Sequence, residues 1–420
     1  MRVAATNMNT KTLSILLLGL FLGTGLCLAA SNDAENPMVS LKGIVDLGGT
    51  KIAYIEAAAP VFGSPSVILS EGERTGDIEV VQINLPQRKV SIRVRDEARN
   101  LTFDSGAQTG TLVEPSSSNP PSGNTVGLCL EKMGLNQILN LYVRLANRTV
   151  LRPARLPTFE LSLYTKGSVS SADLMSAIAN ALKQNDVFIQ PHGDKFLIVA
   201  REGEVSLVAP DVKAASDALA SSLAQTSGSN ADELLPAGLI SLQNTDLSQV
   251  VQIYSDLVGR TIIRPTALPA MTIKLFTATP LTRSEAIYSL SATLALNGVS
   301  LMPAGEKFVF VYPTAQKGMA AGILARKPAA AAAGTNSIPA GSINLMAAAL
   351  PVVAGLYREI SGQSLELNAD LPNVRILFRS QTALTPDEAL LGFEYVLAWN
   401  RLVIEKAENK LILKRAGGDR

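Results

Sequence analysis

One stretch of the sequence occurs twice, 112 positions apart (135 to 247), and the two copies align without a gap. Residues 135–199 match residues 247–311, and a third, more diverged copy follows 103 positions later (254 to 357). A chain built mainly from one repeated small module is typical of proteins that bind and position partners. The matches include Tyr142, Tyr254 and Tyr357; Arg148-Thr149 and Arg260-Thr261; Arg152-Pro153 and Arg264-Pro265; Asp173, Glu285 and Glu388; Asn297 and Asn400; and Lys195, Lys307 and Lys410.

The charge balance argues against a nucleic-acid partner. The 420 residues include 37 Lys+Arg and 36 Asp+Glu, for a formal net charge of +1. A dedicated nucleic-acid binder would present a strongly basic face. The length leaves room for several domains of about 100 residues each.

The N-terminus has the pattern of an export signal. Arg2 and Lys11 precede an uncharged run over residues 13–30, with small residues before Ser31 that suit cleavage. Because this run is close to spanning length, residues 1–30 are expected to be a signal peptide or an inner-membrane anchor. In both cases the remaining chain is expected in the periplasm. After cleavage only Cys129 would remain, so we expect no internal disulfide.

Stretches rich in Pro, Ala and Ser divide the chain into blocks. Such compositions bury too little apolar area to offset chain entropy, and we expect flexible linkers there. The predicted fold class is α+β, with three β-α-β-β-α-β-β modules on flexible linkers and a small antiparallel β-domain. The predicted boundaries are 1–30 for the targeting segment, 38–104 for the β-domain, 125–202, 237–314 and 340–415 for modules 1, 2 and 3, and 105–124, 203–236 and 315–339 for the linkers.

Module 2 is the easiest to interpret. Ile240 and Leu242 begin a short strand, and Asp246, with Gln249 three residues later, is a capping pair for a helix that Gly259 ends. Strands are expected at 261–263 and 271–275.

The second half of each module begins with a helix cap. Thr282 and Glu285 form a capping box before a second apolar helix, and a hairpin over residues 299–312 closes module 2. Module 3 has Thr385 and Glu388 at the corresponding places. Asp173, Glu285 and Glu388 are therefore interpreted as capping residues that stabilise a helix N-terminus, and not as acid/base catalysts.

The β-domain contains short apolar runs that are broken by glycines. Residues 46–51, Asp-Leu-Gly-Gly-Thr-Lys, are similar to a phosphate-binding loop, since glycines let backbone amides approach a phosphate. A kinase would also need a downstream acidic base and a second glycine-rich loop, and none follows. We therefore interpret Gly48-Gly49 as a hairpin turn between two strands.

Module 2 also carries a set of residues at characteristic places. They are Asp246, Gly259, Pro265, Ile273–Leu275, residues 281–286 (Leu-Thr-Arg-Ser-Glu-Ala), Gly298-Val299, Pro303 and Gly305. In these features the modules resemble the N-terminal domains of secretins, which are related to the secretin and TonB N-terminus domain. Secretin domains commonly have an acidic residue where this chain has Arg152 and Arg264, so partner contacts at that place are not carried over. The chain ends at Arg420, shortly after module 3, and we expect no pore-forming β-barrel in it.

The apolar runs of the β-domain and the glycines between them form a recognisable pattern. It consists of Leu41–Val45, Ala53–Ile55, Glu71–Glu73, Gly76-Asp77, Val90–Ile92 and Leu101. In these residues the β-domain resembles the homology-region domain of type II secretion component C, which is also related to the pilus-assembly lipoprotein P. In that family this domain docks on the first N-terminal domain of a secretin.

No candidate catalytic or metal-binding constellation emerges. His192 is the only histidine, and we interpret it as an exposed turn residue, since a metal site or triad needs partners. Cys129 is interpreted as a strand residue without a reactive role. We expect no enzyme activity, no cofactor and no metal.

The resemblances imply a periplasmic adaptor or scaffold of a type II secretion or type IV pilus-like system. Its expected partners are a secretin, other envelope secretion components or a second copy of the chain, with main-chain pairing at strand edges as the docking mode. The alternative is a cell-wall (glycan) binding protein unrelated to secretion. The candidate interface residues are Val90, Ile92, Val94, Ile240 and Leu242.

Overall fold

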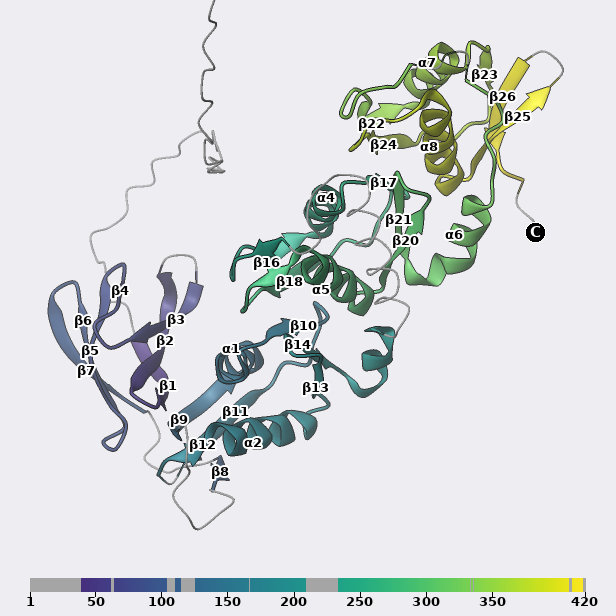
Figure 1. Cartoon of the computed structure of the whole chain (residues 1–420). Coiled ribbons are helices and arrows are strands. Elements are labelled where there is room, and N and C mark those ends of the chain that lie inside the picture. Colours follow the sequence, from purple (N-terminus) through teal and green to yellow (C-terminus); the bar gives the residue numbers. More distant parts are fainter. Residues whose placement is uncertain are drawn as a thin grey trace, which may run out of the picture.

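The computed structural model describes residues 39–61, 64–103, 110–114, 125–165, 167–208, 233–332, 334, 336–407 and 410–417. The expected targeting segment, residues 1–30, lies outside this part of the chain. Within it, helices alternate with several small sheets, and the predicted α+β class is confirmed (Figure 1).

The β-domain is a sandwich of two antiparallel layers. One layer has the strand order β3-β2-β1 and the other β4-β5-β6-β7, and they bury Ile44, Ile55, Val80 and Ile92 between them. The strands are β1 (Val39–Leu47), β2 (Thr50–Val61), β3 (Ser64–Ser70), β4 (Arg74–Thr75), β5 (Ile78–Asn84), β6 (Lys89–Val94) and β7 (Glu97–Thr102).

The interpretation of residues 46–51 as a hairpin is confirmed. Strands β1 and β2 pair in antiparallel register up to Leu47 and Thr50. Gly48 and Gly49 have φ of 63° and 117°, which side chains rarely adopt. Asp46 Oδ1 accepts a hydrogen bond from the Gly49 amide at 3.0 Å and closes the turn.

Module 1 contains two small sheets and two helices. Its first sheet joins β9 to β11, β12 and β8, and its second has the order β10-β14-β13. The elements are β8 (Thr111–Val113), β9 (Thr125–Gly134), α1 (Leu135–Ala146), β10 (Thr149–Leu151), β11 (Glu160–Thr165), β12 (Val169–Ser170), α2 (Ser171–Lys183), β13 (Phe188–His192) and β14 (Phe196–Ala200), followed by a 3-10 helix, η1 (Glu202–Val208).

Module 2 follows the same order, with sheets β16-β18 and β17-β21-β20. Its predicted strands and helices all form. The elements are β15 (Leu234–Leu235), β16 (Ser241–Asp246), α4 (Leu247–Val258), β17 (Thr261–Ile263), β18 (Thr272–Phe276), β19 (Leu281–Thr282), α5 (Arg283–Leu296), β20 (Val299–Ala304) and β21 (Phe308–Pro313).

Module 3 repeats the arrangement with sheets β22-β24 and β23-β26-β25. The elements are β22 (Asn344–Ala349), α7 (Leu350–Ser361), β23 (Leu365–Leu367), β24 (Arg375–Arg379), α8 (Pro386–Trp399), β25 (Leu402–Ala407) and β26 (Lys410–Arg415).

The predicted helix caps form in all three modules. Thr282 Oγ1 accepts from the Glu285 amide and Glu285 accepts from the Thr282 amide, and Thr385 and Glu388 do the same. Ser170 caps α2 through the Asp173 amide. Asp246 caps α4 as expected, although its bond comes from the Ser248 amide (2.8 Å) and not from Gln249.

The prediction of a flexible linker over residues 315–339 is wrong for the described residues. They form η2 (Thr314–Gln316) and α6 (Lys317–Leu324), and they bury Ala320, Ile323 and Ala330 in a core shared with module 3. Two α8 carboxylates hold the segment that follows α6: Glu394 accepts from the Ala329 amide (2.7 Å), and Asp387 accepts from the Ala332 amide. An alanine-rich segment buries too little apolar area to fold alone, but here its alanines pack against the core that contains α8.

The other two linkers lie mostly outside the described residues. Where they are described, they also pair or pack. Strand β8, inside 105–124, pairs in parallel with β11. Within 203–236, Val208 is buried in the core shared by modules 1 and 2, and β15 pairs with β19.

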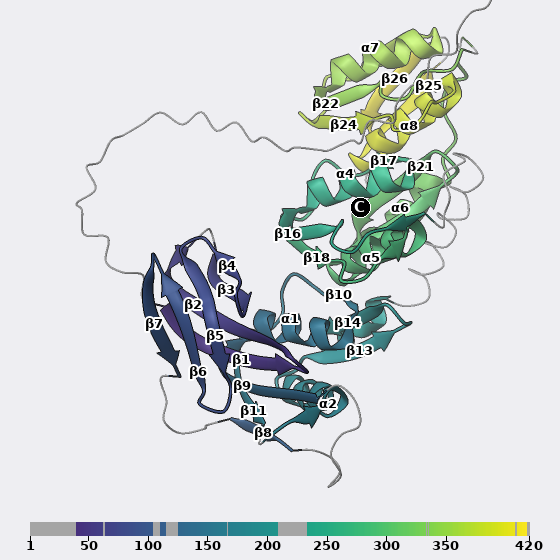
Figure 2. The same cartoon turned by 60° about the vertical axis from the view of Figure 1, so that its left-hand side comes forward.

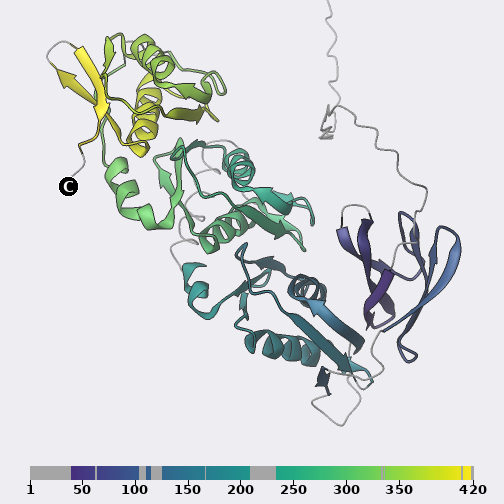
Figure 3. The ribbon, with the colours of Figure 1, turned by 180° about the vertical axis from the view of Figure 1, so that it is seen from behind.

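The three modules follow one another as a stack, and the β-domain lies beside module 1. Figures 1 and 2 show modules 1, 2 and 3 in succession, and Figure 3 shows the same succession from behind. Each core continues across a boundary: one joins the β-domain to module 1, one joins module 1 to module 2, and one joins module 2 to module 3.

Candidate functional site

The candidate functional surfaces are the junctions between these parts. At the junction of modules 1 and 2, helix α5 packs on the outer face of the β10-β14-β13 sheet. The Tyr288 ring lies edge-on to Phe196 (5.3 Å between centroids) and stacks on His192 (5.4 Å). The buried residues that line this junction are Leu151, Phe196, Ile198 and Ala200 from module 1, and Tyr288, Ala292 and Leu296 from module 2.

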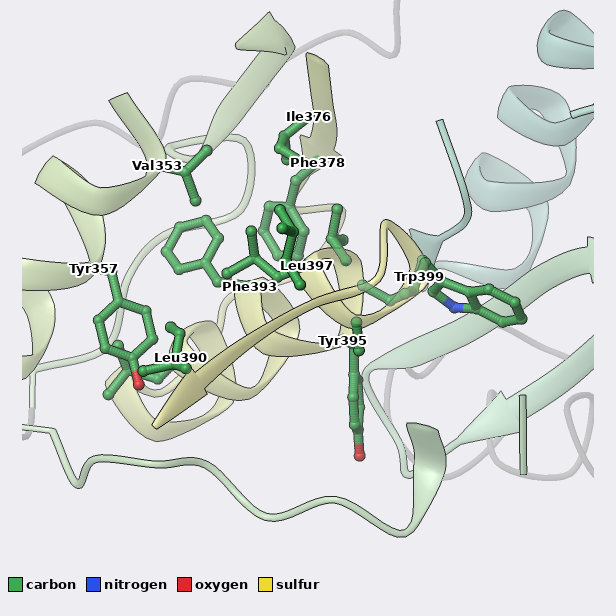
Figure 4. Close-up of a cluster of buried hydrophobic side chains, with 14 of the residues drawn as sticks. Val353, Tyr357, Ile376, Phe378, Leu390, Phe393, Tyr395, Leu397 and Trp399 are labelled. Atoms are coloured by element: carbon green, nitrogen blue, oxygen red, sulfur yellow. The ribbon is translucent and has the colours of Figure 1, made fainter. Parts of the chain in front are cut away.

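The junction of modules 2 and 3 uses the same elements. Helix α8 lies on the outer face of the β17-β21-β20 sheet. Tyr395 contacts the ring of Phe310 (5.0 Å), and Trp399 packs between Phe310 (5.9 Å) and Tyr312 (5.6 Å). In Figure 4, Phe393 lies in the core of module 3, whereas Tyr395 and Trp399 lie on the side of α8 that faces away from this core.

The same hydrogen bonds occur at both junctions. Thr149 Oγ1 accepts from the Ala278 amide (3.1 Å), and Thr261 Oγ1, at the equivalent position, accepts from the Gln381 amide (2.9 Å). Both threonines are buried. Their hydroxyls are the partners of two half-buried amides, and a hydrogen bond of this kind contributes about 0.5–1.5 kcal/mol.

A second pair of equivalent bonds involves the residue that ends each helix. Asn297 Oδ1 accepts from the Ala154 amide at 2.7 Å. Asn400 Oδ1 lies 2.7 Å from Thr266 Oγ1, which occupies the place of Ala154 one repeat later. The two junctions therefore share one geometry.

One ion pair spans the first junction. Lys195 Nζ of module 1 lies 2.6 Å from Glu285 Oε2 of module 2, the oxygen that also accepts from the Thr282 amide. Glu285 therefore caps α5 and contacts the neighbouring module. Only the first role was expected from the sequence.

The β-domain docks on module 1 by strand addition. Strand β1 pairs antiparallel with β9, from Gly43 opposite Leu130 to Leu47 opposite Val126. Val45, Ile52 and Tyr54 extend into the module 1 core. Burial raises the pKa of Tyr54 to about 12, partly offset by Arg144 of α1. The β-domain is therefore joined to module 1 by a continuous sheet and by a shared core.

Modules 2 and 3 close the equivalent edge with a turn. Pro236-Ala237-Gly238 and Pro339-Ala340-Gly341 each form a turn whose glycine has φ of 77°. The residue at the place of Gly238 in module 1 is Val126, which is part of β9 and pairs with Leu47. A residue with a side chain rarely adopts this φ, which belongs to a turn and not to a strand. The turns at Gly238 and Gly341 therefore shorten the strand edge that in module 1 pairs with β1.

The remainder of this edge carries an irregularity in every module. Lys132, Asn244 and Ala347 occupy equivalent positions and all have positive φ, between 48° and 58°. The register of β16 with β18 and of β22 with β24 shifts at this place. Such bulges disfavour further pairing at a strand edge.

The five predicted interface residues are placed in cores. Val90, Ile92 and Val94 lie on β6, which pairs with β5 on one side and β7 on the other, and their side chains are at most 1% exposed. Ile240 and Leu242 are buried in the core shared by modules 1 and 2. Their alternating apolar pattern reflects a buried sheet face. A strand that docks on a partner would show the same alternation, so the pattern alone does not distinguish the two.

The outward helix faces were missed, although the sequence carried a signal. Residues 286–296 are all buried, so α5 has apolar or small residues on every side. A helix that is hydrophobic all round must be covered on two sides. Residues 392–399 of α8 are likewise all buried, with Glu394 as the one charged residue among them, whereas α2 keeps an exposed side.

The expected exposure of His192 is wrong. It lies at the end of β13, half-buried, under Tyr288. Cys129 is a β9 residue as expected, and burial raises the pKa of its thiol.

The described residues contain no group of His, Cys, Asp and Glu side chains that could hold a metal ion. In the same part of the chain, no helix has the length and apolarity needed to cross a membrane.

The geometry defines a stack of α+β modules with a β-sandwich joined to its first member. Comparison with known proteins gave no match: no protein-family model, no curated protein and no solved structure matches the chain.

Proposed function

We propose that this chain is a non-enzymatic periplasmic adaptor or scaffold of a type II secretion or type IV pilus-like system, which docks on a secretin or on a second copy of itself. The observation that carries the proposal is the pairing of β1 with β9. It unites a domain resembling component C with a module resembling a secretin N-terminal domain, the two domain types that dock on each other in those systems.

The stack adds a second argument. Two junctions with the same hydrogen bonds hold the three modules in a fixed succession. A rigid succession of modules presents its outer surfaces at set spacings, as a multi-site partner requires.

The docking surface differs from the one the sequence suggested. Since Val90, Ile92, Val94, Ile240 and Leu242 are buried, we place the contacts on exposed apolar residues of modules 2 and 3. Phe276 on β18 and Met346 on β22 are 54% and 75% exposed.

Site-specific photo-crosslinking in the cell envelope tests the proposal. A crosslinking residue at Phe276 or Met346 is expected to capture the secretin, whereas the same residue at Lys183, exposed on α2, is the matched control. A second copy captured at these positions supports self-docking instead. Capture of neither, together with co-sedimentation of the chain with peptidoglycan, would support the glycan-binding alternative and contradict the proposal. Phe276 is the one aromatic side chain that is largely exposed in the described residues, which gives the alternative little support.

A further inference from the structure

Each junction consists of two matched faces that repeat along the chain. The helix face has three residues at spacing i, i+4, i+8, and the sheet face has three alternating residues of the central strand of the three-stranded sheet. The helix faces are Tyr288, Ala292 and Leu296 in α5, and Leu391, Tyr395 and Trp399 in α8; the sheet faces are Phe196, Ile198 and Ala200 in β14, and Phe308, Phe310 and Tyr312 in β21.

The first module has no apolar helix face. The repeat places Ser176, Asn180 and Gln184 where α5 has Tyr288, Ala292 and Leu296. All three of these polar residues are exposed. Helix α2 therefore offers no apolar side chain to a sheet face at these positions, and packing it there would bury two side-chain amides and a hydroxyl without partners.

The last module has no apolar sheet face. Its closing hairpin is one residue shorter than that of module 2: Ala304 pairs with Phe308, whereas Ala407, at the place of Ala304, pairs with Lys410. Lys410 therefore takes the place of Phe308, and not that of Lys307 as the gapless alignment indicated.

The shift puts a lysine on each side of Ile412 on the outer face of β26. Lys410, Ile412 and Lys414 replace Phe308, Phe310 and Tyr312. Neighbouring strands supply the counter-charges, since Lys410 lies 2.7 Å from Glu366 and Lys414 lies 2.6 Å from Glu405.

Glu366 itself replaces an apolar residue. Its equivalent in module 2 is Ile263, which is fully buried at the junction with module 3. A module placed on this end would have to desolvate four charges, which is unfavourable unless the pairing is excellent.

We infer that the polar helix face of module 1 and the charged sheet face of module 3 are terminal caps that limit the stack to three modules. The modules of this chain stack in one order, and neither end accepts a module from a second copy. Repeat stacks need polar end faces for this reason. If one end carried an apolar helix face and the other a matching sheet face, two copies of the chain would bind head to tail. Such a contact does not close on itself, and copies would grow into filaments. This inference does not depend on the proposed function, and it restricts any contact between copies to surfaces other than the junction faces.

The inference is tested by introducing the residues of an internal junction at each end of the stack. The full chain is used, purified in mild detergent. The helix-end variant carries Ser176→Tyr, Asn180→Ala and Gln184→Leu, the residues of α5. The sheet-end variant carries Glu366→Ile, Lys410→Phe and Lys414→Tyr, the residues of module 2. Far-UV circular dichroism and Trp399 fluorescence verify that each variant is folded.

Sedimentation velocity gives the readout. Each variant alone is expected to keep the mass of the wild type, and mixing the two is expected to give a one-to-one complex of twice that mass. A chain with both ends changed is expected to form open-ended oligomers. Arg379→Phe, which adds an exposed ring to module 3 away from the end face, is the matched control and is expected to join no complex.

Two results would overturn the inference. One is the absence of a complex between folded variants. The other is self-association of the wild type that Ser176→Arg abolishes. If a triple variant fails to fold, Ser176→Tyr and Lys410→Phe as single changes give the same comparison, with at least a tenfold rise in association over the wild type expected on mixing.

Discussion

The hydroxyl of Thr261 accepts a hydrogen bond from the backbone amide of Gln381, 120 positions later in the chain, at 2.9 Å. The bond joins module 2 to module 3, and Thr149 makes its counterpart to Ala278 between modules 1 and 2. Each threonine is fully buried. Because these bonds join neighbouring modules, substitutions that remove them are expected to change the stability of the stack.

Thr261→Val is expected to lower the free energy of unfolding of the module 2–3 unit by about 0.5–1.5 kcal/mol, because the half-buried Gln381 amide loses its hydrogen-bond partner. Thr149→Val is expected to act similarly between modules 1 and 2. Urea unfolding measures both changes. Thr272→Val, at an exposed position of β18, is the control and is expected to change stability by less than about 0.5 kcal/mol. Equal effects of Thr261→Val and Thr272→Val would contradict the role given to the junction bond.

Phe310→Ala is expected to destabilise the junction of modules 2 and 3 by about 3–5 kcal/mol, since a buried ring that contacts Tyr395 and Trp399 is removed. Ile412→Ala, at the equivalent position of module 3, is expected to cost much less because no module covers that face. Thermal unfolding followed by Trp399 fluorescence distinguishes the two. A cost for Ile412→Ala as large as that for Phe310→Ala would show that the end face is covered.

Gly43→Ala is expected to loosen the β-domain from module 1. A Cβ at this position would lie 2.7 Å from Leu130 Cδ2 and 3.3 Å from the Tyr54 ring. Both side chains are buried where β1 meets β9, so they would have to repack. Overpacking of this kind costs about 1–3 kcal/mol. Hydrogen exchange at β1 and β9 should rise accordingly. Gly355→Ala, where α7 has open space, is the control and is expected to stabilise by about 0.5–1 kcal/mol. Unchanged exchange in Gly43→Ala would contradict the docked arrangement.

Glu394 makes the attachment of residues 325–332 depend on pH. Burial raises the pKa of its carboxyl, against smaller opposing effects of the bonds from Tyr357 and Ala329 and of the charge of Arg326. A carboxyl with a raised folded-state pKa stabilises the fold most when it is protonated, and this contribution falls as the pH rises from the ordinary value of about 4.3 through the folded-state pKa.

Glu394→Gln, whose amide oxygen can still accept both bonds, is therefore expected to gain stability relative to the wild type as the pH rises through this window. Urea midpoints of the two proteins across the pH range give the difference. Glu366→Gln, on the exposed end face, is the control, and a flat difference for Glu394→Gln would be evidence against a buried, perturbed carboxyl.

The parts of the fold that depend on near neighbours could be predicted from the sequence. Thr282 and Glu285 lie three residues apart and cap each other, and Gly48-Gly49 closes a hairpin between adjacent strands. Residues whose role depends on distant partners could not be predicted. Val45 and Ile44 look alike in the sequence, but Val45 packs into module 1 and Ile44 into the β-sandwich.

Composition misled in one place for a physical reason. An alanine-rich segment has little capacity to fold by itself, and residues 315–339 were expected to be flexible for that reason. The Glu394 carboxyl provides a hydrogen-bond acceptor for the backbone of the segment, and the core that contains α8 provides the apolar surface on which its alanines pack. The candidate surface was wrong for a related reason: alternating apolar residues such as Val90 and Ile92 indicate a buried face without saying which part of the molecule buries it.

Trp399 provides the most direct test that the modules form one rigid stack. It is the only tryptophan of the chain, and it is 4% exposed because Phe310 and Tyr312 of the neighbouring module cover it. The native protein should show blue-shifted indole emission and slow quenching by acrylamide, and Phe310→Ala should shift emission to longer wavelength and speed quenching while the helix content stays the same. Emission of a solvent-exposed indole in the folded wild-type chain would contradict the stack.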